Sequence, residues 1–506
     1  MEEVVARTAR LMESREYWRR ALIAIYSAAG VSLLWSCAGA AWVTTARLVL
    51  QGLGLTFAVC FFSLRTQLLG LVGPEGILPA DAYVRSCREA VSDGAARRAR
   101  LLATVQRAAA RNPELGEQAL ARLPRVDLRL AVQRGVLKTL ELFGGGASER
   151  GLLLLCDAGA ACSVALVVAP GCAAQPALLA VAWWCYLVLK RTCRDFLNLQ
   201  WDSLLLEMAV LAWPLSVPGA LPLSLPPCIW CLHLLLFKLM FSSGVCKLRS
   251  NCPSWRSLTA MTYHYQTQPL PHVLSWHAHG LPVWVHRLSA AATLVLELPV
   301  PLLIFCGGVG RLSAFLATAG LMVLIVATGN YGCFNYLTLV LAVSLLSDEQ
   351  LLMFGCADAA TADATANTLP AALQYFHLLV CWTAVIALGL SASVPLTAVG
   401  RFGTPPLQLP AAITDLHTML APLGTGKGYG LFAQMTTFRW ELVFQGSDQS
   451  EGPWAEYQFP HKPGRVDRHP LWVFPGHMPR LDWQVIPTPS HLLDHISPIF
   501  SPFFLV

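Results

Sequence analysis

Four charged side chains inside apolar runs are the residues of this sequence that could do chemistry: Asp202 and Glu207 in LNLQWDSLLLE, Lys238 in LLLFKLMF and Glu297 in TLVLELPV. Charges within apolar spans are expensive, so they usually face the interior of a helix bundle, where they pair or serve function. Asp202 lies five residues before Glu207, so on a helix their side chains point roughly 140° apart. They are not an obvious acid/base dyad, and pairing of Lys238 with one of the carboxylates is favoured over proton transfer or catalysis.

The segment 241–288 gathers Ser, Cys, His, Trp and Tyr between apolar runs. Its histidines, His264, His272, His277 and His279, lack the companion Cys or carboxylate pattern of a zinc site. A serine or cysteine nucleophile needs a base and an orienting group, and no G-x-S-x-G elbow occurs. We predict no metal, no cofactor and no catalytic residue, and expect an ordered loop whose aromatic rings pack on helix ends at the membrane interface.

Most of the 16 cysteines lie inside apolar runs, so we expect them to be small, buried apolar side chains. Cys228 and Cys231 form a C-x-x-C in PPCIWCLHLL, but no βαβ pattern surrounds it, so two buried thiols are favoured over dithiol exchange. Cys246 and Cys252 border the polar loop. They are the better candidates for a disulfide if that loop faces an oxidising lumen.

A polytopic α-helical membrane protein must position these residues. The chain of 506 residues is 55% hydrophobic and only 13% charged, so lipid must cover much of its surface. A helix needs about 20 apolar residues to span the hydrocarbon core. We expect about eight to ten hydrophobic segments, with candidate windows at 19–36, 46–72, 151–169, 173–189, 203–222, 227–243, 284–306, 310–328, 332–347 and 375–397. Pro214 and Pro218 interrupt 203–222, and 332–347 is short, so either is a candidate for a broken or re-entrant segment.

The formal net charge of +6 is modest, and many of the arginines gather in residues 85–138. The positive-inside rule places this stretch in the cytosol; an amphipathic helix on the membrane surface is a compatible alternative. Acidic lipid head groups are the expected neighbours, and nucleic acid is not an expected partner. The N-terminus lacks the pattern of a cleaved signal peptide, so the first hydrophobic helix is expected to be an uncleaved anchor.

The chain divides by composition into six parts. Residues 1–84 hold N-terminal membrane helices and a GILP-type loop, 85–150 an Arg-rich amphipathic connecting segment, and 151–398 the membrane core with its polar loop 244–283. A linker rich in Pro, Gly and Thr follows at 399–424. Alternating runs such as FRWELVFQG and WAEYQF then predict a β-rich soluble domain at 425–485, followed by a tail at 486–506.

A colinear series of motifs resembles the lipase maturation factor family. In the membrane core these are GLVGPEGILPA (70–80), LQWDSLLLE (199–207), FKLMFSSGVCKL (237–248), CPSWRSLTAMTYHYQTQPLP (252–271) and LTLVLAVSLLSD (337–348). In the C-terminal part they are YGLFAQMTTFRWELVFQGSD (429–448), EYQFPHKPG (456–464) and PRLDWQ (479–484). After PRLDWQ the chain departs from the family pattern, so 486–506 is expected to be a divergent tail.

The resemblance implies a multi-pass protein of the endoplasmic reticulum membrane that helps secreted proteins, lipases by resemblance, to fold and assemble. It implies a non-catalytic factor with its C-terminal domain in the lumen. Because the family has no recognised catalytic residues, only motif positions are carried over as candidate client-contact or structural residues: Trp255, Tyr263, His264, Tyr265, Gln266, Thr267, Gln268 and Pro269.

A membrane enzyme is the alternative, because the helical architecture, the GILP-type loop and the polar core are also similar to vitamin K-dependent carboxylases. Its chemistry would need Lys238 and His264 to converge on one cavity, whereas a packed core between them would argue against it. A transporter would show polar residues along a pathway and inverted repeats, and the sequence shows neither.

Overall fold

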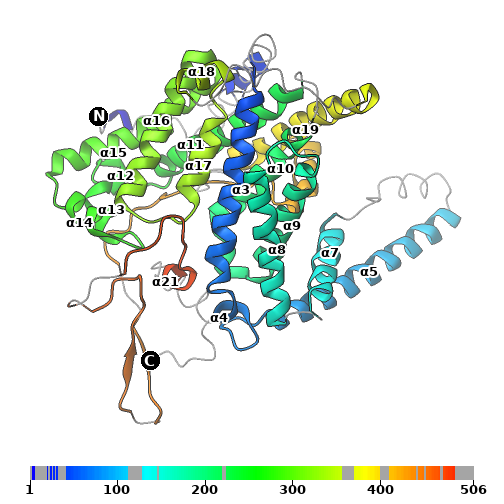
Figure 1. The fold of residues 1–506 in the computed structure, drawn as a ribbon, viewed down its shortest axis with the longest axis horizontal. Helices are drawn as coiled ribbons and strands as arrows, with labels where there is room; N and C mark the ends of the chain where they lie inside the picture. The colour runs from blue at the N-terminus through cyan, green and yellow to red at the C-terminus, as the bar shows by residue number, and fades with distance from the viewer. Residues whose placement is uncertain are drawn as a thin grey trace.

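The fold is given by a computed structural model of the chain (Figure 1). It describes residues 41–111, 128–144, 148–218, 224–355, 370–398, 409–439, 443–449, 452–465 and 471–484, together with isolated residues outside these ranges. The predicted tail 486–506 and most of the window 19–36 lie outside the described residues.

The described residues form a bundle of helices with one small hairpin (Figure 1). The longer helices are α3 (Val43–Arg65), α5 (Ala80–Arg111), α7 (Leu128–Leu142), α8 (Glu149–Val168), α9 (Gln175–Thr192), α10 (Gln200–Ala212), α11 (Leu225–Arg249), α15 (Val283–Glu297), α16 (Gly307–Thr328), α17 (Phe334–Val343), α19 (Ala371–Ala398) and α20 (Ala411–Leu420). Shorter helices are α4 (Leu68–Val72), α12 (Pro253–Arg256), α13 (Ala260–Thr267), α14 (Val273–His279), α18 (Asp348–Met353) and α21 (Arg480–Gln484). Short 3₁₀ turns include η1 (Arg194–Leu197), η2 (Trp213–Ser216) and η4 (Val300–Phe305).

Six helices within the described residues are long and apolar enough to cross a membrane. They are Val43–Arg65, Glu149–Val168, Leu225–Arg249, Val283–Phe305, Gly307–Thr328 and Ala371–Leu396. The expected count of eight to ten is not confirmed. The window 203–222 holds α10, which gives way to the 3₁₀ turn η2 at the position of Pro214, and the window 332–347 holds only the ten-residue α17.

Side chains at both ends of the bundle fix where helices begin and how closely they pack. The start of α3 is capped from far along the chain: Asp348 accepts the backbone N–H groups of Val43 at 2.8 Å and Thr45 at 3.0 Å. Ser148 caps α8 by accepting the N–H of Gly151 at 3.1 Å. Small residues let α3 and α8 come close, because a Cβ at Gly159 would lie 2.3 Å from the ring of Phe61.

The β structure of the C-terminal part is smaller than the alternating pattern suggests. Within the described part of 425–485, two three-residue strands, β1 (Phe444–Gly446) and β2 (Ala455–Tyr457), pair antiparallel, with Phe444 opposite Tyr457. This hairpin projects away from the bundle (Figure 1). Much of the backbone that precedes the hairpin packs on the membrane core. Its polar groups therefore form hydrogen bonds with side chains of the helices instead of with other strands.

The long connections of the chain meet at one end of the bundle, here called the loop end, where α3 ends at Arg65 and α11 ends at Arg249. Gln67, just after α3, donates to the carbonyl of Met478 at 2.7 Å. The polar loop reaches the same end, since Ser250 after α11 bonds to the carbonyl of Ala433.

The Arg-rich segment starts at the loop end as well. Arg194 lies over the ring of Tyr83, near the start of α5, at 5.7 Å from the ring centroid, and Arg480 donates to the carbonyl of Phe196 in the same 3₁₀ turn. The start of the Arg-rich segment and the C-terminal segment therefore lie at the same end of the bundle, which does not agree with a cytosolic location of one and a lumenal location of the other; both locations stay predictions. The positive-inside rule is the weaker guide, because it holds for connections up to roughly 60 residues and residues 66–148 form a longer one.

This arrangement predicts that the start of the α7–α8 connection and the tip of the hairpin share one side of the membrane. Protease sites inserted after Gly144 and after Asp448 should give the same result in sealed microsomes, both cut or both protected. A matched site after Gly171, between α8 and α9 at the opposite end of the bundle, should give the other result. Different behaviour of the first two sites would contradict the fold.

Candidate functional site

Three buried ion pairs hold the charges of the membrane core. Lys238 Nζ lies 2.6 Å from Glu207 Oε1, which confirms that Lys238 pairs with one of the intramembrane carboxylates. Lys247 Nζ lies 2.6 Å from Glu297 Oε2, and a nitrogen of Arg480 lies 2.7 Å from Asp202 Oδ2. All six side chains are buried. Buried charges need such partners, because desolvation of a lone ion is costly.

Glu207 also holds the start of the C-terminal segment. Its Oε1 accepts the backbone N–H of Gly426 at 2.9 Å, and its Oε2 accepts the hydroxyl of Tyr429 at 2.6 Å. Lys238 lies 5.1 Å from the centroid of the Tyr429 ring. The carboxylate therefore has donors on both oxygens, which leaves it well satisfied inside the bundle.

Asp202 holds the end of the same segment. Arg480, the first residue of α21, binds both oxygens of Asp202, at 2.7 and 2.8 Å, and Tyr186 donates its hydroxyl to Oδ1 at 2.6 Å. The forked geometry of guanidinium and carboxylate fixes direction as well as distance. Just before this contact, Gly476 adopts φ +84°, and a Cβ there would lie 2.7 Å from Val59, so glycine allows the chain to enter against α3.

Lys247 connects α11, α15 and the C-terminal segment. Besides Glu297 it donates to the carbonyl of Leu431 at 3.0 Å, and it lies 5.3 Å from the centroid of the Trp255 ring. Trp255 itself is buried and donates its indole N–H to the carbonyl of Phe432 at 2.9 Å. Trp255, one of the motif residues, thus holds the C-terminal backbone.

The rest of the motif 263–269 lies between the loop end of the bundle and the C-terminal segment. Gln268 donates to the carbonyl of Thr328 at 2.8 Å and accepts the hydroxyl of Tyr331 at 3.2 Å. Arg439 donates to the carbonyls of Gln268 and Pro269. Thr267 donates to the carbonyl of Tyr263 at 2.8 Å, within α13. These contacts are structural, whereas Tyr265 and Gln266 line a cavity.

His264 is packed among aromatic side chains. Its ring makes an edge contact with Phe432 at 5.2 Å between centroids, and its Nε2 lies 3.4 Å from the hydroxyl of Tyr331. Burial, with a smaller contribution from the charge of Lys247, lowers the pKa of His264 to about 4. The imidazole is therefore neutral near pH 7.

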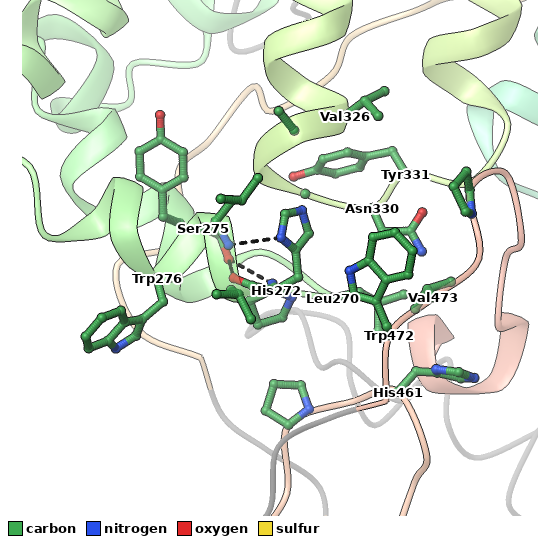
Figure 2. Close-up of a pocket in the computed structure, with 18 of the residues that line it drawn as sticks. Leu270, His272, Ser275, Trp276, Val326, Asn330, Tyr331, His461, Trp472 and Val473 are labelled. Carbon is green, nitrogen blue, oxygen red and sulfur yellow. Dashed lines mark hydrogen bonds between the residues drawn. The ribbon is translucent and has the colours of Figure 1, made fainter.

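The cavity has a volume of about 800 Å³, within the range of small-molecule sites. Its walls come from three places (Figure 2): His272 and Ser275 at α14, Val326 and Tyr331 at the end of α16 and the turn after it, and Trp472 with Val473 from the C-terminal segment. The walls are mostly apolar. The cavity is thus completed by two regions that the sequence analysis treated separately, the polar loop and the C-terminal domain.

The other predicted site features are distributed differently. Cys246 and Cys252 are free thiols, so the disulfide predicted between them is absent; Cys252 Sγ instead accepts the backbone N–H of Met435 at 3.3 Å. Cys228 and Cys231 are both buried thiols, as expected. In the described part of the chain, no three His, Cys, Asp or Glu side chains come together as a metal site would require.

Lys238 and His264 do not share a cavity. The space beside Lys238 and Glu207 has a volume of only about 20 Å³, and neither Lys238 nor His264 lines the larger cavity near α14. Neither of these two cavities brings Lys238 and His264 together, so they give no support to the carboxylase-like chemistry considered for this pair.

Sequence reasoning did not identify several residues that complete these contacts. Arg480, Lys247 and Tyr429 hold the buried carboxylates, but they lie at helix ends or outside the apolar windows. The motifs PRLDWQ, FKLMFSSGVCKL and YGLFAQM contain all three, so the resemblance marked their positions without their roles. No periodic pattern relates Asp202 to a residue as distant as Arg480.

The geometry defines a class: a polytopic helical membrane protein whose C-terminal segment is fixed to the membrane core by buried ion pairs. Residues 119–353 match the lipase maturation factor transmembrane domain, and residues 426–504 match the lipase maturation factor C-terminal domain. The chain belongs to the lipase maturation factor family. The second match includes most of the tail 486–506, which was expected to diverge.

Individual relatives agree with this assignment. Lipase maturation factor 2 of Rattus norvegicus is 34% identical over 87% of this chain and 71% of its own length, and that of Homo sapiens is 34% identical with the same coverage. Lipase maturation factor 1 of Bos taurus is 26% identical over 88% of this chain and 75% of its own length. No solved structure matches the chain significantly.

The pair of Arg480 and Asp202 is expected to stabilise the attachment of the C-terminal segment. Arg480→Ala leaves a buried carboxylate without its cation, which costs about 3–5 kcal/mol of unfolding free energy. Limited proteolysis should then release the segment after Leu420 faster than in the parent protein. The control is Arg465→Ala, which removes a solvent-exposed pair with Asp467 in the same C-terminal segment and should change the release little. Equal effects of the two variants would refute the role of Arg480.

The lowered pKa of His264 should make the unfolding free energy depend on pH. The folded state holds the ring neutral down to about pH 4, whereas the unfolded chain takes up a proton near its ordinary pKa of about 6.5. The unfolding free energy should therefore fall as the pH drops from about 6.5 to about 4. Thermal unfolding in detergent measures this slope, which His264→Gln should reduce and His277→Gln, at an exposed position of α14, should leave unchanged.

Proposed function

We propose that the protein is a maturation factor of the endoplasmic reticulum membrane that helps secreted proteins, lipases by family, to fold and assemble. Membership of the family carries this proposal. The protein acts as a binding partner for immature clients, without catalysing a reaction on them. Its work is to hold apolar client surface until the client's own packing covers it.

Exposed aromatic side chains of the C-terminal segment support a client-binding role. Four of them, here called the client surface, are Phe438, Trp454, Tyr457 and Phe474, with 70%, 51%, 65% and 73% of their surface exposed. Large aromatic rings dominate the energetics of protein interfaces. Their exposure on a segment outside the membrane helices is suited to transient contact with apolar surface.

The backbone that carries the client surface is held in place. Asp482 of α21 accepts the N–H groups of His461 at 2.9 Å and Lys462 at 3.0 Å, just after the hairpin. Phe444 and Phe459 pack at 5.7 Å between ring centroids at the base of the hairpin. A surface ordered in advance loses less entropy when a client binds.

The proposal places the loop end of the bundle in the lumen, where secreted proteins fold. Protease sites after Gly144 and after Asp448 should then both be protected in sealed microsomes and be cut once detergent opens the membrane. Cutting of both sites in intact microsomes would contradict a lumenal client surface while leaving the fold unaffected.

The function is tested in cells that lack their own maturation factor and express a secreted lipase. This chain should raise the activity of the secreted lipase per unit of lipase protein. Replacing Trp454 and Phe474 by Ala should lower that gain several-fold, because each buried large apolar side chain contributes roughly 1.5–3 kcal/mol to an interface.

The control for this test is a double replacement by Ala of Phe376 and Leu379, exposed residues on the candidate span α19. It removes similar apolar surface from a face suited to lipid and should leave the gain intact. A gain that survives in the Trp454 and Phe474 variant, at equal protein abundance, would exclude the client surface. No gain from the parent chain would exclude the lipase-maturation role itself.

A further inference from the structure

The large cavity lies beside the ends of two candidate membrane spans. Val326 and Ala327, in the last turn of the candidate span Gly307–Thr328, form part of one wall, and the candidate span beginning at Val283 starts four residues after the lining residue His279. The third wall, around Trp472, belongs to the C-terminal segment outside the membrane helices (Figure 2). A cavity at this depth is reachable from the bilayer.

The helix α14, which forms the outer wall, is itself suited to the membrane interface. Val273, Leu274 and Trp276 are exposed apolar residues on this short helix. Tryptophan is enriched where a bilayer meets water, because its ring is apolar and its N–H is polar. Lipid therefore has direct access to the wall of the cavity.

The lining of the cavity has no permanently charged side chain. None of the described residues that line it is Asp, Glu, Lys or Arg. Its titratable side chains include four histidines, His272, His277, His279 and His461. The Nδ1 of His272 accepts the N–H of Leu274 at 3.2 Å, and burial lowers the pKa of this ring. A carboxylate or phosphate placed here would lose its hydration without meeting a lysine or an arginine, so the cavity favours uncharged ligands over anions.

One buried polar atom in the wall has no partner. Asn335 Oδ1 is buried without a hydrogen-bond partner among the described residues, and Asn335 lines the cavity. A buried amide oxygen left unpaired is costly, and it is satisfied by a donor such as a hydroxyl group. Asn335 lines the same cavity as the apolar residues Leu270 and Val473.

We propose that this cavity binds a neutral lipid that bears a hydroxyl group, with the apolar body of the lipid against Leu270, Val326 and Val473 and its hydroxyl donating to Asn335. A monoacylglycerol and a sterol share this chemistry. An apolar peptide does not fit as well, because its many backbone N–H and C=O groups would need more partners than this lining provides. Lipid binding here is independent of the client surface, which lies on other residues.

The test uses the full chain purified in detergent and photoreactive lipid probes. One arm uses a diazirine monoacylglycerol and another a diazirine sterol, each competed with its unlabelled parent lipid. Saturable labelling of peptides from α14 or from the end of α16 by either probe is expected, and the arm that labels identifies the class. A fatty acid probe and a phosphatidylserine probe should not label these peptides in a saturable way.

Two variants and a control locate the site. Val326→Trp fills the cavity and should abolish saturable labelling, whereas Val323→Trp, on an exposed position of the same helix, should not. Asn335→Leu removes the hydrogen-bond acceptor and should weaken binding about tenfold, as the loss of one buried hydrogen bond implies. This second variant keeps the test decisive if Val326→Trp fails to fold.

Three results would overturn the proposal. They are equal labelling of the Val326 and Val323 variants, saturable labelling by the charged probes at the same peptides, and competition by an apolar peptide but not by neutral lipid. Failure of the lipid test would leave the lipase secretion assay unaffected, since that assay depends on Trp454 and Phe474.

Discussion

Three carboxylates buried in an apolar bundle require three cations. This requirement determines how the C-terminal segment packs against the membrane core. Asp202, Glu207 and Glu297 would each be costly as lone ions. Lys238 and Lys247 supply two of the cations from α11, the central helix, and the third comes from Arg480 near the far end of the chain. Buried pairs of this kind do more to specify one arrangement than to add net stability, because removing one partner costs far more than the pair contributes.

The C-terminal segment follows from these pairs. Its first part is fixed where Gly426 and Tyr429 donate to Glu207, and its last part where Arg480 binds Asp202. Between these two attachments the chain leaves the bundle, forms the hairpin and returns, which places Trp472 across from α14 (Figure 2). The cavity and the client surface thus exist only because both ends of one segment are attached to the membrane core.

The membrane character, most of the spans and the pairing of Lys238 could be predicted from the sequence, because apolar length and the cost of buried charge are local properties. The arrangement at the loop end could not. Which carboxylate meets Arg480 depends on packing of segments far apart in the chain. The start of the predicted β-rich domain also packs on the bundle, where carbonyls in 431–433 accept from Lys247, Ser250 and Trp255. The side of the membrane on which the arginines lie stays a prediction, because the positive-inside rule holds for short connections and the Arg-rich segment belongs to a long one.

The placement of charged side chains also explains the chemistry of the cavity. The three buried ion pairs of the core lie where the C-terminal segment attaches, and the cavity is lined by apolar and polar side chains without Asp, Glu, Lys or Arg. Electrostatics therefore fixes the position of the segment, while contact with lipid or with an immature client is left to apolar surface and single hydrogen bonds. Such contacts are weak individually and reversible, which suits a factor that must release what it binds.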